Sequence, residues 1–357
     1  MPHKKLCLAM SGGVDSAAAA MLLQQAGYEV SAVTLRLHRD TDRPGICGAG
    51  DDIDLAREVA ASMGIPHTVL DLCQLFRDTV MANFVSEYVR GRTPNPCGDC
   101  NREIKFGALL DWALEQGADA MATGHYARVG YDETTGRHLL LRGRDRRKDQ
   151  SYFLFQLTQR QLAHLLLPVG EFEKPDIRAL AEGRGLANAR KPDSQDICFV
   201  PDGDYAAFLQ KQGVELRPGN FVDEAGRVLG PHQGLERYTM GQRKGLGISL
   251  GAPAYVLRKE LETGNVVLGG NEALFTRELT AERCNWISIP ELTTPMTVTA
   301  KTRYSQREAA AVISPLPDGR VRAVFEEAQR AVTPGQAVVL YDGDTVVGGA
   351  AILKGEP

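Results

Sequence analysis

The sequence predicts an α/β protein whose doubly wound parallel-sheet domain is followed by a small central β-rich domain and a C-terminal β-barrel. With 357 residues, the chain is too long for one ordinary core. Short apolar runs alternate with helical periods as far as about residue 123, which is typical of crossover units. After residue 213 the pattern changes to glycine-rich turns and short strands. We therefore expect domains at 1–205, 206–272 and 273–357.

The first domain shows strands and helices in strict alternation. Strands are expected over 5–10, 29–35, 66–72 and 118–125, and helices over 17–27, 52–64 and 106–117. The run RHLLLRG (137–143) predicts an added strand, and helical spacing predicts helices over 158–170 and 174–185. Ligands are expected at the carboxyl ends of the parallel strands.

The last part of the chain carries several short β-like runs separated by turn signals such as PDG and YDGD. The runs cover 297–304, 309–315, 320–326 and 336–352. Such spacing is typical of a small barrel or sandwich.

Composition limits the class of protein. No apolar run reaches the roughly 18 residues that span a bilayer, and the N-terminus reads as a first strand, not an export signal. We therefore expect a soluble, cytoplasmic protein. Seven cysteines, an odd number in a large chain, favour thiolate chemistry over a disulfide framework. The net charge of -4 does not indicate a nucleic-acid binder, but the run RGRDRRK (142–148) is a local basic patch or a solvated hairpin tip.

The stretch SGGVDS (11–16) follows the first predicted strand and opens an alanine-rich helix. Two glycines let the backbone approach phosphate, and the helix N-terminus with two serine hydroxyls favours an anion. No GK[ST] follows, so the loop differs from the kinase type and resembles the pyrophosphate loop of ATP pyrophosphatases. This makes the first domain a nucleotide-binding domain. The residues expected at ATP are Ser11, Gly12, Gly13, Val14, Asp15 and Ser16, with Leu35, Gly124 and His125 at later strand ends.

Two of these residues have more than one interpretation. Asp15 is expected either to hold Mg²⁺ or to orient the loop. His125, in ATGHYAR, is expected to contact ATP, and its alternative is a capped surface histidine.

Five motifs occur in order along the chain: GRTPNPCGDCNREIKF, ATGHYAR, KDQSYFL, SQDICFV and YTMGQRKGLGI. In order and separation they resemble those of bacterial tRNA-specific 2-thiouridylases over essentially the whole chain. The resemblance implies that ATP adenylates the C2 carbonyl of the wobble uridine in the tRNAs for Lys, Glu and Gln. Sulfur then replaces the oxygen, with release of AMP and pyrophosphate.

The same resemblance assigns roles to two cysteines. It makes Cys198 the persulfide carrier and Cys100 its partner, which forms a disulfide with it after sulfur transfer. Many relatives carry aspartate three residues before the loop cysteine, where this chain has Cys97, and Asp99 stands next to Cys100. We expect Cys100, Cys198 and Asp99 to be catalytic.

The departure at Cys97 creates a CxxC motif and leaves three hypotheses open. Cys97, Cys100 and Cys198 suit three irons of a 4Fe-4S cluster, which is our preferred interpretation. Persulfide chemistry without any cluster, with Cys97 as a bystander or helper, is the second. Zinc held by the three thiolates and His125 or water is the third.

A base inside tRNA must leave its stack to react, which calls for cations on phosphates and polar groups near bases. The residues expected at tRNA are Lys105, Arg128, Arg144, Arg147, Lys148, Gln150, Arg243 and Arg303. The other expected partner is a sulfur donor, either a persulfide-carrying protein or inorganic sulfide. We expect no DNA and no membrane partner.

Two rival functions remain. One is another ATP pyrophosphatase ligase that acts on a small acid or nucleotide, and the other is a non-catalytic RNA-binding or cluster-storage protein. Cys100 and Cys198 argue against the first, and the complete SGGVDS loop argues against the second.

Overall fold

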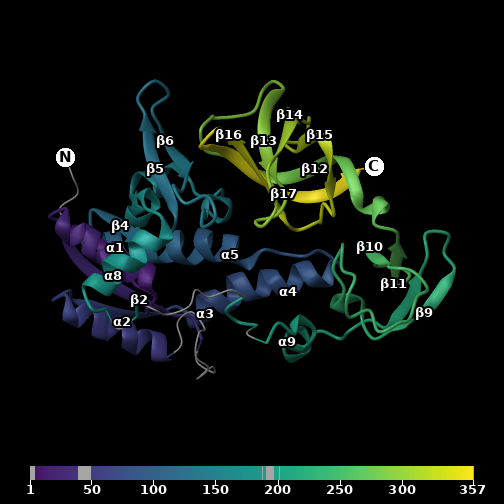
Figure 1. Cartoon of the computed structure of the whole chain (residues 1–357). Helices are drawn as coiled ribbons and strands as arrows, with labels where there is room; N and C mark the ends of the chain where they lie inside the picture. The colour runs from purple at the N-terminus through teal and green to yellow at the C-terminus, as the bar shows by residue number, and fades with distance from the viewer. Residues whose placement is uncertain (1–4, 39–49, 187, 190–196, 201, 357) are drawn as a thin grey trace.

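The structure is a computed structural model that describes residues 5–38, 50–186, 188–189, 197–200 and 202–356 (Figure 1). The first domain is built on a parallel five-stranded sheet in the order β3-β2-β1-β4-β7. Its strands are β1 (Lys5–Ala9), β2 (Glu29–Arg36), β3 (His67–Asp71), β4 (Ala120–Thr123) and β7 (Leu165–Leu166). The predicted doubly wound architecture is thus confirmed.

Helices cover both faces of this sheet because side chains alternate along its strands. On β1, Leu6 and Leu8 are buried against one set of helices, and Cys7 is buried in the core on the opposite face. The helices of the first set are α1 (Val14–Gln25), α2 (Gly50–Ser62) and α8 (Lys174–Gly183). The opposite face is covered by α6 (Leu109–Glu115).

Two longer helical segments leave the sheet toward the rest of the molecule. The first consists of α3 (Cys73–Phe76), a π-helical turn (Arg77–Met81) and α4 (Ala82–Val89). The second consists of α5 (Pro96–Asp99), a π-helical stretch (Cys100–Ala108) and α6. In Figure 1, α4 and α5 run beneath the C-terminal barrel. Departures from α-helical hydrogen bonding of this kind are frequent at functional sites.

The central part is a separate four-stranded sheet in the order β10-β11-β8-β9. Its strands are β8 (Gly219–Val222), β9 (Val228–His232), β10 (Tyr255–Glu260) and β11 (Asn265–Gly269). Phe221, Tyr238 and Val256 belong to its own small core. The helix α9 (Tyr205–Lys211) precedes it.

The C-terminal part is a closed six-stranded antiparallel barrel, because its first and last strands pair with each other. The predicted barrel is confirmed. Its strands are β12 (Phe275–Trp286), β13 (Met296–Lys301), β14 (Ala309–Pro315), β15 (Val321–Arg330), β16 (Ala337–Asp342) and β17 (Thr345–Glu356).

Two predicted elements of the first domain differ in the structure. The strand predicted over 137–143 is β6 (Arg137–Arg142), which forms a hairpin with β5 (Ala127–Asp132) and pairs with β17 of the barrel. The helix predicted over 158–170 is wrong in its second half. Only α7 (Gln159–Ala163) is an α-helix, because the leucines that follow form β7 beside β4.

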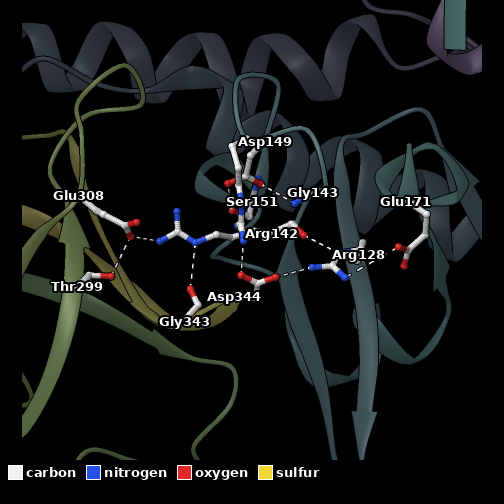
Figure 2. Close-up of polar contacts among 11 residues, drawn as sticks. Arg128, Arg142, Gly143, Asp149, Ser151, Glu171, Thr299, Glu308, Gly343 and Asp344 are labelled. Atoms are coloured by element: carbon white, nitrogen blue, oxygen red, sulfur yellow. Dashed lines mark hydrogen bonds and ion pairs between the residues drawn. The ribbon is translucent and has the colours of Figure 1, made fainter. Parts of the chain in front are cut away.

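Charged side chains fix this hairpin to the barrel (Figure 2). Arg142 is buried, its guanidinium lies 3.7 Å from the centre of the Tyr341 ring, and it pairs with Glu308. Asp344 pairs with Arg128, at 2.8 Å, and with Arg146. The basic run 142–148 is therefore not a hairpin tip, and part of its charge is neutralised by barrel carboxylates.

None of the helices in the described ranges has the length and apolar character needed to cross a bilayer.

Candidate active site

The loop between β1 and α1 has the geometry of an anion-binding site. Gly12 has φ +73°, and a Cβ there would lie 2.5 Å from the carbonyl oxygen of Asp52, so only glycine fits. The Ser16 hydroxyl accepts from the Ser11 N–H at 3.2 Å and donates to the Gly13 carbonyl at 3.0 Å. The loop is thus closed on itself and opens α1, whose N-terminal N–H groups favour phosphate.

The end of β4 lies against this loop. A Cβ on Gly124 would be 2.7 Å from the Ser16 nitrogen, so the glycine lets the strand end touch the start of α1. His125 follows, and its Nδ1 is 2.7 Å from the Thr123 hydroxyl. Burial, with a smaller effect of Lys105, holds the pKa of His125 well below its usual value. The residues predicted at ATP from these two segments therefore lie together, with a neutral imidazole beside them.

Asp15 occupies the first turn of α1 and is held by two side chains that the sequence analysis did not identify. Lys174 Nζ donates to both carboxylate oxygens, at 2.7 and 2.8 Å, and the Tyr126 hydroxyl donates to one of them at 2.7 Å. In this arrangement both oxygens of Asp15 are engaged by neighbouring side chains, which is compatible with the predicted role of orienting the loop. Nothing in the spacing around Lys174 signals this contact, which depends on the packing of α8 on α1.

Two of the three predicted sulfur-handling cysteines lie in one apolar cluster. Cys100, at the start of the π-helical stretch, is 9% exposed in this cluster. Cys198 is half-buried against the same cluster, which also contains Phe76, Phe84 and Phe199. Two cysteines from distant parts of the sequence therefore contribute to one apolar cluster. Leu35, at the carboxyl end of β2, packs against the same cluster.

Cys97 is placed differently. Its side chain is exposed, and it does not belong to the apolar cluster of the other two. Among the residues that the structure describes, no three His, Cys, Asp or Glu side chains gather as a metal ion requires. The ligand set predicted for a 4Fe-4S cluster or for zinc is therefore not assembled in this structure.

His38, which follows β2, is a further residue of this site that sequence reasoning missed. Its Nε2 is 4.0 Å from the Cys198 sulfur, and its ring lies edge-on to Phe76 at 5.0 Å. Burial lowers the pKa of His38, which favours the neutral imidazole and leaves one ring nitrogen able to accept a proton. The only available signal was its position just beyond a strand end.

Replacing His38 by phenylalanine tests this contact, because an aromatic ring keeps the packing and removes the nitrogen. Alkylation of Cys198 at pH 7 is expected to slow roughly tenfold if the imidazole assists loss of the thiol proton. Mass spectrometry of the Cys198 peptide across a pH series measures it. His138→Phe, on the distant β6 hairpin, is the matched control, and an unchanged pH profile for His38→Phe would remove the histidine from the site.

Asp99 is held by polar neighbours. Asn83 donates to its carboxylate at 2.7 Å, and Arg102 is 3.6 Å away. Burial raises the pKa of Asp99, and the Asn83 hydrogen bond opposes that effect. Its side chain lines a cavity that faces the barrel, whereas Cys100 packs into the apolar cluster. This position suits a residue that fixes the loop.

The residues predicted at tRNA fall into three groups. Arg144, Arg147 and Arg243 are exposed, and Lys105 and Lys148 are half-buried. The third group is Arg128, which pairs with Asp344, Gln150, whose oxygen accepts from the Tyr126 N–H, and Arg303, which donates to Thr333. Arg147 also lies near a carboxylate, 3.9 Å from Asp145.

Comparisons with known proteins cover almost the whole chain. Family models match at residues 4–202 (tRNA methyl transferase HUP domain), 206–270 (tRNA methyl transferase PRC-barrel domain) and 276–352 (aminomethyltransferase beta-barrel domain). The tRNA-specific 2-thiouridylase MnmA of Acetivibrio thermocellus is 51% identical over 99% of this chain and 100% of its own. That of Moorella thermoacetica is 52% identical over 97% of this chain and 98% of its own.

Among solved structures, a 4-thiouridine synthetase–RNA complex with bound ATP is similar in part. It shares 17% identity with a TM-score of 0.37, over 58% of this chain and 50% of that one. This likeness is too distant to carry an argument about chemistry.

Proposed function

The chain belongs to the tRNA-specific 2-thiouridylase family, and we propose that it thiolates the wobble uridine of tRNA at the expense of ATP. The observation that carries the proposal is that Cys100 and Cys198 share one apolar cluster at the carboxyl end of β2. A phosphate-binding loop opens α1 in the same domain. In this proposal the loop at α1 serves activation of the uridine oxygen, and the two cysteines serve delivery of sulfur. Both lie within one domain.

The first step is adenylation. The C2 carbonyl oxygen of uridine attacks the α-phosphorus of ATP, and pyrophosphate leaves from the loop at the start of α1. Glycine backbone, two serine hydroxyls and the helix N-terminus suit this leaving group. ATP would enter as its magnesium complex, with Asp15 orienting the loop.

The second step replaces oxygen by sulfur. Cys198 carries a persulfide, and the Cys100 thiolate attacks the inner sulfur, which forms a Cys100–Cys198 disulfide and releases hydrosulfide. Hydrosulfide attacks C2, AMP leaves with the former carbonyl oxygen, and loss of a proton gives the C2 thiocarbonyl. Alternatively, the terminal persulfide sulfur attacks C2 directly and AMP leaves; the Cys100 thiolate then attacks the Cys198 sulfur, which forms the disulfide and releases the thiocarbonyl. With a persulfide-carrying protein as donor, a reductant first opens the disulfide, and the Cys198 thiolate then takes the outer sulfur of the donor persulfide, whose own thiolate leaves. With inorganic sulfide as donor, hydrosulfide attacks the Cys198 sulfur of the disulfide, which forms the Cys198 persulfide and releases the Cys100 thiolate.

The test supplies ATP, a persulfide donor and a tRNA for Lys, Glu or Gln. Pyrophosphate release and 2-thiouridine, measured by nucleoside mass spectrometry, should both require uridine at the wobble position. A tRNA with cytidine there is the matched control. Pyrophosphate release without any tRNA would instead favour a ligase that acts on a small acid or nucleotide. The setting of the reaction is the cytoplasm, where tRNA and ATP are found.

Exposed arginines are expected to supply the phosphate contacts. Raising salt from 50 to 200 mM should weaken tRNA binding by about 10³-fold if several cations meet phosphates. Arg144→Ala and Arg147→Ala should each reduce the slope of log Kd against log salt by about one, measured by filter binding. Arg57→Ala, an exposed arginine on α2 that pairs with Asp54, is the control. A flat salt response would reject these contacts.

A further inference from the structure

The turn that precedes β16 in the barrel forms hydrogen bonds with the segment that leads to Cys100. Thr93 donates its N–H to the Pro334 carbonyl at 2.9 Å, and Gln336 Nε2 donates to the Thr93 carbonyl at 2.8 Å. The same amide is 3.3 Å from the Pro94 carbonyl. Three backbone groups of the catalytic domain, just before α5, are thus engaged by barrel residues.

An ion pair and a close backbone approach complete this contact. Arg92 donates to the carboxylate of Glu282, on β12, at 3.1 Å. Gly335 has φ +89°, and a Cβ there would lie 2.9 Å from the Arg92 Cβ and 3.0 Å from the Thr93 nitrogen and oxygen. We call Glu282, Pro334, Gly335 and Gln336 the barrel clamp.

The clamp is anchored firmly on its own side. Gly335 donates its N–H to the Ile352 carbonyl at 2.9 Å, and Ile352 donates its own N–H to the Gln336 carbonyl at 2.8 Å. The turn is therefore tied to β17, the strand that closes the barrel. If the clamp and residues 92–94 are pushed apart, either residues 92–94 shift or β17 shifts together with the clamp.

A cavity adjoins the segment that leads into α5. A cavity of about 430 Å³ lies between the catalytic domain and the barrel, and Asn95, Gly98 and Asp99 line it. Its opposite wall includes Arg283 and Asn285 of the barrel. Close packing normally fixes the position of a helix, and this side of α5 has less of it. The contacts of the barrel clamp with residues 92–94 therefore contribute more to the position of α5 and Cys100 than they would if α5 were closely packed on this side.

We propose that the barrel clamp positions the Cys100 helix for sulfur transfer, so that the barrel acts on the second half of the reaction and not only on tRNA binding. The inference rests on the proposed function, which gives Cys100 its task. Thiol–disulfide exchange requires in-line approach of two sulfurs, and a misplacement of about 1 Å costs roughly 100-fold in rate. Adenylation at the α1 loop needs no contribution from Cys100 and should be insensitive to the clamp.

Gly335→Ala is the test, because the added methyl group wedges the clamp open. Gly319→Ala is the matched control: Gly319 has φ +77° in a turn of the same barrel, and a Cβ there meets nothing within 4 Å. Both variants carry similar backbone strain, and only the first has the wedge. Full-length protein is used for both.

Two readouts are expected to separate the variants. In Gly335→Ala, single-turnover sulfur transfer should fall about 100-fold while tRNA-dependent pyrophosphate release stays within about threefold of the control. Without tRNA, alkylation of Cys100 should be faster than in the control, with buried Cys73 unchanged in both as the internal reference. Gln336→Ala combined with Glu282→Gln should shift both readouts in the same direction, and it decides the matter if Gly335→Ala fails to fold.

Either of two results would overturn the proposal. One is Cys100 alkylation equal to that of the control, and the other is a parallel fall of pyrophosphate release and sulfur transfer. The alkylation readout needs no turnover, so it remains decisive even if the wild-type protein does not thiolate tRNA, a result that would reject the proposed function instead.

Discussion

Cys198→Ser is expected to abolish sulfur transfer while tRNA-dependent pyrophosphate release continues. The substitution preserves size and removes the only atom able to carry a persulfide at that position, so the loss should be about 10³-fold or more. In the proposed mechanism adenylation uses the loop at α1, which is closed by hydrogen bonds among Ser11, Gly13 and Ser16. Nucleoside mass spectrometry and a coupled pyrophosphate assay measure the two halves on the same sample.

Cys100→Ser should fail at a different point. Cys198 would still accept sulfur from the donor, but no neighbouring thiol would cleave the persulfide, so the Cys198 peptide should accumulate with one additional sulfur. Cys284→Ser is the control, since Cys284 is half-buried in the barrel. Thiolated tRNA from Cys198→Ser would contradict the assignment of the carrier.

Cys97→Ser separates the persulfide route from the cluster hypothesis. The persulfide route predicts little change, because Cys97 lies outside the cluster of the other two thiols. Iron and acid-labile sulfide near four per chain in protein purified without oxygen, and lost in Cys97→Ser, would instead identify a 4Fe-4S centre. In that case the segment around Cys97 must rearrange when the cluster is assembled.

Asp15→Ala should both block adenylation and lower the free energy of unfolding by about 3 kcal/mol. The Lys174 side chain is 7% exposed, and removal of the carboxylate leaves its buried charge without that compensation. Asp111→Ala is the matched control. It breaks the Arg160–Asp111 pair, whose side chains are 60% and 51% exposed, and should cost under about 1 kcal/mol.

A double variant separates the two effects of Asp15. Asp15→Leu with Lys174→Met removes both charges and should recover much of the stability, because an apolar pair replaces a largely buried ionic one. Adenylation should stay blocked, since the loop has lost the group that orients it. Denaturant titration and pyrophosphate release are measured together. Normal pyrophosphate release in either variant would show that the loop does not depend on Asp15.

Local chemistry explains which parts were predictable from the sequence. The SGGVDS loop and the alternation of strands and helices depend on backbone freedom and side-chain periodicity, which neighbouring residues determine. The stretch 158–170 failed because its leucines suit a helix equally well, and only pairing with β4 turns Leu165–Leu166 into a strand.

Contacts between distant segments explain what the sequence did not reveal. The pairing of Arg142 with Glu308 and of Asp15 with Lys174 joins residues far apart in the chain, and neither has a local signal. The basic run 142–148 is therefore assigned to tRNA phosphates from its composition. In the structure, Arg142 and Arg146 of this run pair with the barrel carboxylates Glu308 and Asp344. Likewise, His38 meets Cys198 only through the fold, and composition gave no reason to pair them.

The hairpin of the catalytic domain has a thermodynamic consequence. β6 hydrogen-bonds to the barrel, with the Arg142 N–H donating to the Asp344 carbonyl at 2.8 Å, and the Tyr152 hydroxyl donates to the Ala337 carbonyl at 3.0 Å. Loss of the barrel would remove these hydrogen bonds and the Glu308 partner of Arg142. It would also expose the apolar core that Leu140 and Tyr152 share with Val339 and Tyr341 of the barrel. We therefore expect the catalytic domain and the barrel to unfold as one cooperative unit, even though the sequence places a domain boundary between them.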